Sequence, residues 1–291
     1  MSIDPEFDSL VPANVFDRRR FLVTSLGAGF ALATQPVMAQ TAIHTDATGL
    51  IAGEVGVPVK DGEMVAYRAA PAGQTGPAVV LVVSEIFGVH EYVRDICRRL
   101  AKLGYCAIAP ELFARQGDPR QIAGIQEILD RITAKTPDAQ VLSDLDACVA
   151  WAAAQGGDTR RLGITGFCWG GRIVWLYSAH NPAVKAGVAW YGRLVGTASD
   201  LAPRHPLDVV GQLQAPVLGL YGGKDAGIPI ETIEAMRSAL QQGSPVAKAS
   251  EIHLYDNAPH AFHADYRPSY RKEVAEDGWR RMLAWFRQHG V

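Results

Sequence analysis

The chain of 291 residues lacks the features that mark several large classes of protein. It has only four cysteines and no C-x-x-C pair, so neither a zinc knuckle nor a dense disulfide framework is expected. It also lacks an excess of basic charge, because 28 Lys and Arg residues stand against 30 Asp and Glu residues and give a formal net charge of -2. Binding to a phosphate backbone needs such an excess. Nucleic acid is therefore not an expected partner.

A long apolar run is missing from the N-terminal region as well. The run 21–34 covers about 21 Å at roughly 1.5 Å per residue, less than the roughly 30 Å of a bilayer core, so no stable membrane span is expected. Arg18 and Arg19 precede this run and small residues end it at Ala39, which is the pattern of an export signal. The pattern resembles twin-arginine signals. It predicts a signal peptide over 1–39, transient contact with export machinery and a periplasmic protein; the alternative is a basic tail.

The rest of the chain is predicted to form a lead-in linker over 40–52 and a single domain over 53–291. The run 78–84 is continuously apolar and rich in valine, as expected of a parallel strand buried on both faces. Strands and helices then alternate, which predicts an α/β fold with a mostly parallel sheet and helices on both faces. The expected strands are 55–59, 64–69, 78–84, 106–109, 162–165, 186–190, 217–221 and 252–255, and the expected helices are 91–103, 141–154, 172–178, 230–240 and 270–289.

One short segment carries the signature of a nucleophile. Gly166-Phe167-Cys168-Trp169-Gly170 follows an expected strand and precedes an expected helix, which is the context of a nucleophile elbow with cysteine as the nucleophile. Such a sharp turn leaves no space for a Cβ on either side of the nucleophile, so glycines are needed there. The alternative is that Cys168 is a buried and inert thiol.

An acid and a base follow in the order that such an elbow requires. Asp225 comes directly after the strand that ends at Tyr221, and His260 comes shortly after the strand that ends at Tyr255. Because the carboxyl ends of parallel strands meet at one edge of a sheet, we expect Cys168, Asp225 and His260 to lie together. The competing acids are Asp208 and Asp256, and the competing bases are His253 and His263.

Over 53–291 the chain resembles the dienelactone hydrolase (carboxymethylenebutenolidase) family of α/β-hydrolases. Besides the elbow and the acid and base segments, the resemblance rests on 85–89, 109–115 and 190–192, each of which follows an expected strand. It implies an α/β-hydrolase fold and hydrolysis of small lactones or activated esters. It also implies a Cys-His-Asp triad, a thioester acyl-enzyme, and neither a cofactor nor a metal.

The resemblance assigns further roles to residues of this chain. The acidic residue at the Glu85 position contacts the nucleophilic thiol in the family, and an arginine at the Arg115 position binds the carboxylate of the substrate. The family has a second carboxylate-binding arginine four residues after the catalytic histidine. This chain has Ala264 at that place. Arg267 is the candidate substitute.

The proposed roles agree with the chemistry of acyl transfer. Pairing with an imidazolium favours the reactive thiolate, so His260 would take the proton of Cys168 and Asp225 would hold the imidazole. The backbone N–H groups of Ile86 and Trp169 are the candidates for an oxyanion hole. Glu85 opposes thiolate formation, so it is either a gate that an anionic substrate opens or a structural residue in an ion pair or a hydrogen bond.

Further residues have two interpretations each. Phe87 and Tyr191 are walls of a substrate pocket or parts of the core. Arg115 is a carboxylate clamp or a solvated loop charge. Cys97, Cys106 and Cys148 fall on apolar positions and are read as buried thiols.

Two alternatives to a lactone hydrolase remain open at this point. One is a general carboxylesterase with no preference for anionic substrates. The other is a non-catalytic thiol sensor that uses Cys168 for oxidation on the same fold. An acid and a base in triad order favour the enzyme, because a sensor needs only a reactive thiol. The expected protein is a monomer that acts on a small-molecule lactone or ester.

Overall fold

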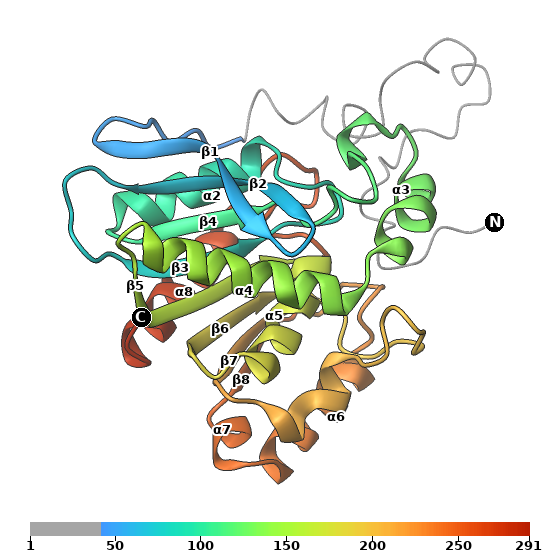
Figure 1. Ribbon diagram of the computed structural model, residues 1–291. Helices are drawn as coiled ribbons and strands as arrows, with labels where there is room; N and C mark the ends of the chain where they lie inside the picture. Colours follow the sequence, from blue (N-terminus) through green and yellow to red (C-terminus); the bar gives the residue numbers. More distant parts are fainter. Residues whose placement is uncertain (1–41) are drawn as a thin grey trace.

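The computed structural model describes residues 42–291 (Figure 1). The expected export signal, with Arg18, Arg19 and the cleavage site after Ala39, lies outside these residues and stays a prediction. Within the described part, no helix has both the length and the apolar character needed to cross a membrane.

The described chain alternates strands and helices in the order that the sequence predicts. The strands are β1 (Leu50–Val59), β2 (Gly62–Pro71), β3 (Ala78–Val83), β4 (Cys106–Pro110), β5 (Asp158–Phe167), β6 (Val184–Trp190), β7 (Val217–Gly222) and β8 (Glu251–Tyr255). The α-helices are α2 (Glu91–Lys102), α3 (Ile125–Arg131), α4 (Asp138–Ala154), α5 (Trp169–His180), α6 (Ile230–Gln242), α7 (Pro245–Lys248) and α8 (Lys272–Gln288). The short 3₁₀ helices are η2 (Pro119–Gln121), η3 (Thr133–Lys135) and η4 (Pro206–Gln212).

All eight described strands form one sheet in the order β1-β2-β4-β3-β5-β6-β7-β8. β2 is antiparallel to both of its neighbours, and every pair from β4 to β8 is parallel. Figure 1 shows α4 and α5 in front of the sheet and α8 behind it, so helices cover both faces. The predicted α/β architecture with a mostly parallel sheet is confirmed.

Burial explains why the central strands are the ones that the sequence shows most clearly. All six residues of β3 are buried, as a strand between two parallel neighbours and two helical layers must be. β1 lies at the sheet edge and is mostly half-exposed, and it begins at Leu50, inside the stretch expected to be a linker. The sequence analysis missed α3, a seven-residue helix that buries only Ile125 and Ile128 and is too short for a clear period.

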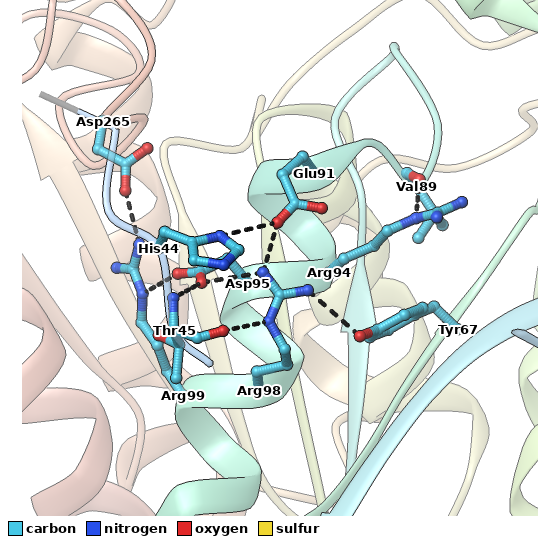
Figure 2. A network of polar contacts seen from close by, with 10 residues as sticks. All are labelled: His44, Thr45, Tyr67, Val89, Glu91, Arg94, Asp95, Arg98, Arg99 and Asp265. Atoms are coloured by element: carbon cyan, nitrogen blue, oxygen red, sulfur yellow. Dashed lines mark hydrogen bonds and ion pairs between the residues drawn. The ribbon is translucent and has the colours of Figure 1, made fainter. Parts of the chain in front are cut away.

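A buried polar network fixes the segment before β1 to helix α2 (Figure 2). Asp95 is 1 % exposed and accepts hydrogen bonds from the backbone N–H of Thr45 at 2.5 Å and from Arg99 Nε at 2.5 Å. Arg98 Nε donates to the carbonyl oxygen of Thr45 at 2.7 Å, so both backbone groups of Thr45 are bound. The segment that the sequence marks as a lead-in is therefore docked on the domain.

Close packing of glycine backbone fixes the junction between β5 and α5. A Cβ on Gly170 would lie 2.4 Å from the carbonyl oxygen of Val83 and 2.6 Å from that of Ser84, distances that real Cβ atoms do not show. The first turn of α5 therefore lies directly against the end of β3. This contact decides where α5 begins relative to the sheet.

We predict that Gly170→Ala lowers the free energy of unfolding by about 3 kcal/mol or more, because backbone atoms, which cannot rotate away, occupy the space of the new methyl group. Gly211→Ala is the matched control, since a Cβ there meets no atom within 4 Å. Urea unfolding of both variants is the measurement. Equal midpoints for the two variants would contradict the packing argument.

Candidate active site

Cys168 lies at the turn between β5 and α5 with a strained backbone. Its φ is 54° and its ψ is -118°, and its residue is 1 % exposed. A Cβ on Gly166 would lie 2.4 Å from the carbonyl oxygen of Gly170, so the first glycine of the motif is required by the approach of the helix. The steric reason given for the glycines is confirmed. The geometry is that of a residue held at the tip of a sharp turn.

Asp225 and His260 meet at the same edge of the sheet, after β7 and β8. His260 Nδ1 lies 2.6 Å from Asp225 Oδ2, and both side chains are buried. Cys168 interacts with the same imidazole. Burial alone would lower the pKa of His260, but the charges of Asp225 and Cys168 raise it well above its ordinary value. The cluster therefore favours the imidazolium form of His260.

Glu85 follows β3 and is surrounded by groups that stabilise its charge. Tyr266 donates its hydroxyl hydrogen to Glu85 Oε2, and His90 Nε2 lies 3.7 Å from the same oxygen. Burial would raise the pKa of Glu85, but hydrogen bonding to His90 and the charge of Arg267 lower it below its ordinary value. Glu85 is thus held as a carboxylate although it is only 1 % exposed.

Arg267 is the cation of this cluster. It is 1 % exposed, and the carbon of its guanidinium lies 5.2 Å from the ring centres of both Phe87 and Tyr266. Burial would lower its pKa, but Tyr266, Glu85 and Cys168 raise it. Arg267 therefore supplies a positive charge near the thiol, although this chain has Ala264 at the place where the family has its second arginine.

An ion pair outside the site holds the segment that carries Tyr266 and Arg267. Arg99 on α2 donates from Nη2 to Asp265 Oδ2 at 2.6 Å, as Figure 2 shows, and Arg99 also binds Asp95. This pair connects the network around the lead-in segment to the residues beside Glu85. The sequence analysis missed Tyr266 and His90, because neither lies in a motif and only the fold brings them to Glu85.

The structure does not support the assignment of Arg115 as a carboxylate clamp. Its guanidinium makes two hydrogen bonds to Asp61, at 2.6 and 2.5 Å, and two to Asp144, at 2.7 and 3.1 Å. Two carboxylates of the chain itself thus use the donors that a substrate would need. The physical reason is that β1 and β2 bring the turn with Asp61 to the loop after β4, a contact between distant segments that the local sequence does not show.

The two candidates for oxyanion donors lie in adjoining segments. Trp169 is the first residue of α5, so its N–H has no acceptor within the helix. Ile86 lies in the segment after β3, and the end of β3 contacts the first turn of α5.

Tyr191 is buried, and its ring lies edge-on to that of His260 with 5.1 Å between centres. It therefore forms a wall beside the imidazole.

The competing acids and bases have other partners or lie elsewhere in the fold. Asp208 accepts the backbone N–H of His205 at 2.8 Å, and Asp256 is exposed after β8. His263 is buried and lies 2.6 Å from the hydroxyl of Tyr92, while His253 lies within β8. The structure thus pairs His260 with Asp225 rather than with either competitor.

The three other cysteines lie away from the turn that carries Cys168. All four cysteines are free and buried, and burial raises the pKa of Cys97, Cys106 and Cys148. A thiol with a raised pKa forms little of the reactive thiolate. Among residues 42–291, no group of three or more His, Cys, Asp or Glu side chains is placed to hold a metal ion.

The strand order, with Cys168 after β5, Asp225 after β7 and His260 after β8, defines the α/β-hydrolase class. Residues 64–290 match the sequence profile of the dienelactone hydrolase family. The chain belongs to this family, and it is a hydrolase of ester or lactone bonds.

Several known proteins resemble most or all of the chain. One from Methylorubrum extorquens is 60% identical over 292 residues, covering 100% of this chain and 99% of its own, and one from Escherichia coli is 54% identical over 270 residues, covering 92% and 98%. Both are provisionally named carboxymethylenebutenolidases. A crystal structure of a provisionally named dienelactone hydrolase from Klebsiella pneumoniae is 58% identical, with a TM-score of 0.79, and covers 82% of this chain and 99% of that one.

A further relative bears a more specific name. The protein from Bradyrhizobium is 34% identical over 230 residues, which is 77% of this chain and 89% of its own. It is provisionally named a 2-oxo-3-(5-oxofuran-2-ylidene)propanoate lactonase.

We predict that the imidazole of His260 titrates well above the ordinary histidine pKa of about 6.5 and that Asp225→Asn lowers this pKa. The carboxylate stabilises the imidazolium, so its loss lets the proton leave at lower pH. Nuclear magnetic resonance of labelled histidine reports the titration, with the signal assigned through its absence in His260→Gln. Asp256→Asn is the control and should leave the pKa unchanged. Titration at or below the ordinary pKa would show that the pair with Asp225 does not form.

Proposed function

We propose that the chain hydrolyses small enol lactones and activated esters, with Cys168 as nucleophile, His260 as acid and base, and Asp225 as the residue that orients His260. The observation that carries the proposal is the buried contact of 2.6 Å between His260 and Asp225, on the edge of the sheet where Cys168 interacts with the same imidazole. The three residues meet only because β5, β7 and β8 end at the same edge of the sheet.

In the first half of the proposed reaction the thiolate of Cys168 attacks the carbonyl carbon and forms a C–S bond. The carbonyl oxygen becomes an oxyanion that the N–H groups of Ile86 and Trp169 stabilise, and losing one such donor typically costs about 3 kcal/mol of barrier. The C–O bond to the leaving group then breaks, and the imidazolium of His260 gives its proton to the departing oxygen. The product on the enzyme is a thioester.

In the second half, neutral His260 takes a proton from a water molecule that attacks the thioester. The C–S bond breaks, which restores the thiolate beside the imidazolium that already holds the proton from water. The carboxylic acid then gives its remaining proton to solvent and leaves as its carboxylate. A thiolate expels alkoxides and amide nitrogens poorly, because it is the better leaving group. Activated esters and enol lactones are therefore favoured over peptides.

The proposed substrate carries a negative charge. The Bradyrhizobium relative is named for a lactone that contains a propanoate group, and we extend this chemistry to the present chain. Arg267 is the residue proposed to attract that carboxylate, because it is the buried cation beside Glu85 and Cys168. Glu85 would then act as the gate: a substrate carboxylate that binds Arg267 weakens the hold of Arg267 on Glu85.

The two alternatives make different demands on these residues. A general carboxylesterase uses the same triad but gains nothing from Arg267. A thiol sensor needs only a reactive Cys168 and makes no use of a base oriented by an acid. The buried pairing of His260 with Asp225 therefore supports the enzyme.

We predict that Cys168→Ala abolishes hydrolysis of an enol lactone and that Asp225→Asn lowers kcat by roughly a hundredfold or more, because the members of a triad act as one unit. Steady-state kinetics of the purified variants is the measurement. Cys148→Ala, which removes another buried thiol, should keep its activity. Turnover by Cys168→Ala at near the normal rate would overturn the proposed nucleophile.

We predict that Arg267→Gln lowers the preference for an anionic lactone over its methyl ester by roughly tenfold or more, because a charge-assisted contact is lost. Arg115→Gln is the matched control and should leave this ratio of kcat/KM unchanged, since Arg115 is bound to Asp61 and Asp144. The double variant Glu85→Gln/Arg267→Gln removes both charges and guards against misfolding from an unpaired carboxylate. A ratio that falls only in Arg115→Gln would restore the clamp.

A further inference from the structure

A cavity of about 300 Å³ lies at the edge of the sheet where β3, β4 and β5 begin. Residues of the connection between β2 and β3 and the residues just after α4 line it. Cys168 and His260 follow the opposite ends of strands, so the cavity is separate from the proposed active site. Its volume is at the lower limit of small-molecule sites, roughly 300 to 1,000 Å³. We call it the amino-edge pocket.

Arg68 is the only charged side chain among the described residues that line the amino-edge pocket. It is half-buried, and its Nε is closed off from solvent and has no hydrogen-bond partner. Within residues 42–291 its guanidinium forms no ion pair and donates no hydrogen bond to an oxygen atom. Arg115, by contrast, pairs with two carboxylates. Arg68 is therefore a cation whose charge the described chain does not match.

Two neutral groups hold the guanidinium of Arg68 in place. Its carbon lies 5.9 Å from the ring centre of Trp151, which belongs to the last turn of α4. The thiol of Cys106, the first residue of β4, is its other neighbour. Burial raises the pKa of this thiol, although Arg68 lowers it, so Cys106 is uncharged at neutral pH and only a weak acceptor. These contacts position the cation and leave its donors for another partner.

A half-buried charge is costly unless a group of opposite charge is beside it. The negative end of α4, which ends at Ala154, favours a cation nearby, but it carries only about half a unit charge. A guanidinium is a planar fork that binds a carboxylate through two parallel hydrogen bonds. An anion in the amino-edge pocket would supply the partner that Arg68 lacks in the chain.

The walls of the pocket favour one kind of anion. Ile51, Ala70 and Pro77 provide apolar surface, and Thr75 and Gln155 provide uncharged polar side chains. Because the lining has one cation, it matches a single negative charge and not the double charge of a phosphate. A short carboxylate with an apolar chain satisfies the charge, the apolar surface and the small volume together.

We propose that the amino-edge pocket binds a small organic monocarboxylate, whose carboxylate group pairs with Arg68 and whose chain packs against the apolar wall. No residue of the triad takes part. The inference goes beyond the proposed function and does not rest on it, because the pocket and the active site lie at opposite edges of the sheet. Binding can therefore be tested whether or not the protein hydrolyses a given ester.

Nuclear magnetic resonance of the labelled protein tests the place and the chemistry of binding. Titration with butyrate should shift the amide signals of Gly73, Gly76 and Gly156, which line the pocket, until they saturate. Butyramide, a neutral analogue of similar shape, should bind about tenfold more weakly or less, because it cannot form the charge-assisted pair. No saturable shift of these signals, or equal binding of butyramide, would overturn the proposal. Tighter binding of inorganic phosphate than of butyrate would overturn the choice of a carboxylate.

Variants test the role of Arg68. Arg68→Gln should weaken butyrate binding by about tenfold or more. Arg160→Gln is the matched control, since it removes the same charge from an 89% exposed side chain on β5, and it should bind butyrate as the wild type does. If circular dichroism shows that Arg68→Gln does not fold, Arg68→Lys replaces it, which keeps the charge and loses the fork. Wild-type affinity in a folded Arg68 variant, or an equal loss in Arg160→Gln, would overturn the site.

Discussion

The close approach of α5 to the ends of β3 and β5 is the constraint on which the site depends. Glycine backbone at 166 and 170 lets the helix begin where a Cβ would collide with carbonyl oxygens at 2.4 Å. Cys168 is thereby forced to a φ of 54° at the tip of the turn, a conformation that only surrounding structure can hold. Its thiol is thus placed at the carboxyl edge, where the segments after β7 and β8 bring Asp225 and His260.

The site buries several ionisable groups close together, and neighbouring groups of opposite charge stabilise them. Asp225 and Cys168 stand on either side of the His260 imidazole, and Arg267 offsets the charge of Glu85. Buried charges are tolerated when each has a partner of opposite sign and hydrogen bonds. This arrangement raises the pKa of His260, which supports the proposed thiolate–imidazolium pair, and Arg267 is the proposed partner of an anionic substrate.

Sequence alone predicted the sheet, its helical layers and the positions of Cys168, Asp225 and His260, because these depend on local periodicity and on loops that follow strands. It offered Arg115 as a carboxylate clamp or a solvated loop charge and did not predict its ion pairs with Asp61 and Asp144, because these contacts join three segments far apart in the chain. The contacts of Tyr266 with Glu85 and His90 could not be predicted for the same reason. Side-chain partners between loops follow from tertiary packing, which no spacing of residues encodes.

The central claim is that acyl transfer passes through a thioester on Cys168. The most direct test is rapid acid quenching of the enzyme during turnover of an activated ester, followed by mass spectrometry of its peptides. The account predicts a peptide containing Cys168 that is heavier by the mass of the acyl group, and a larger yield of it in Asp225→Asn if deacylation is slowed more than acylation. An acyl group on another residue, or full turnover with no acylated peptide at any quench time, would contradict the account.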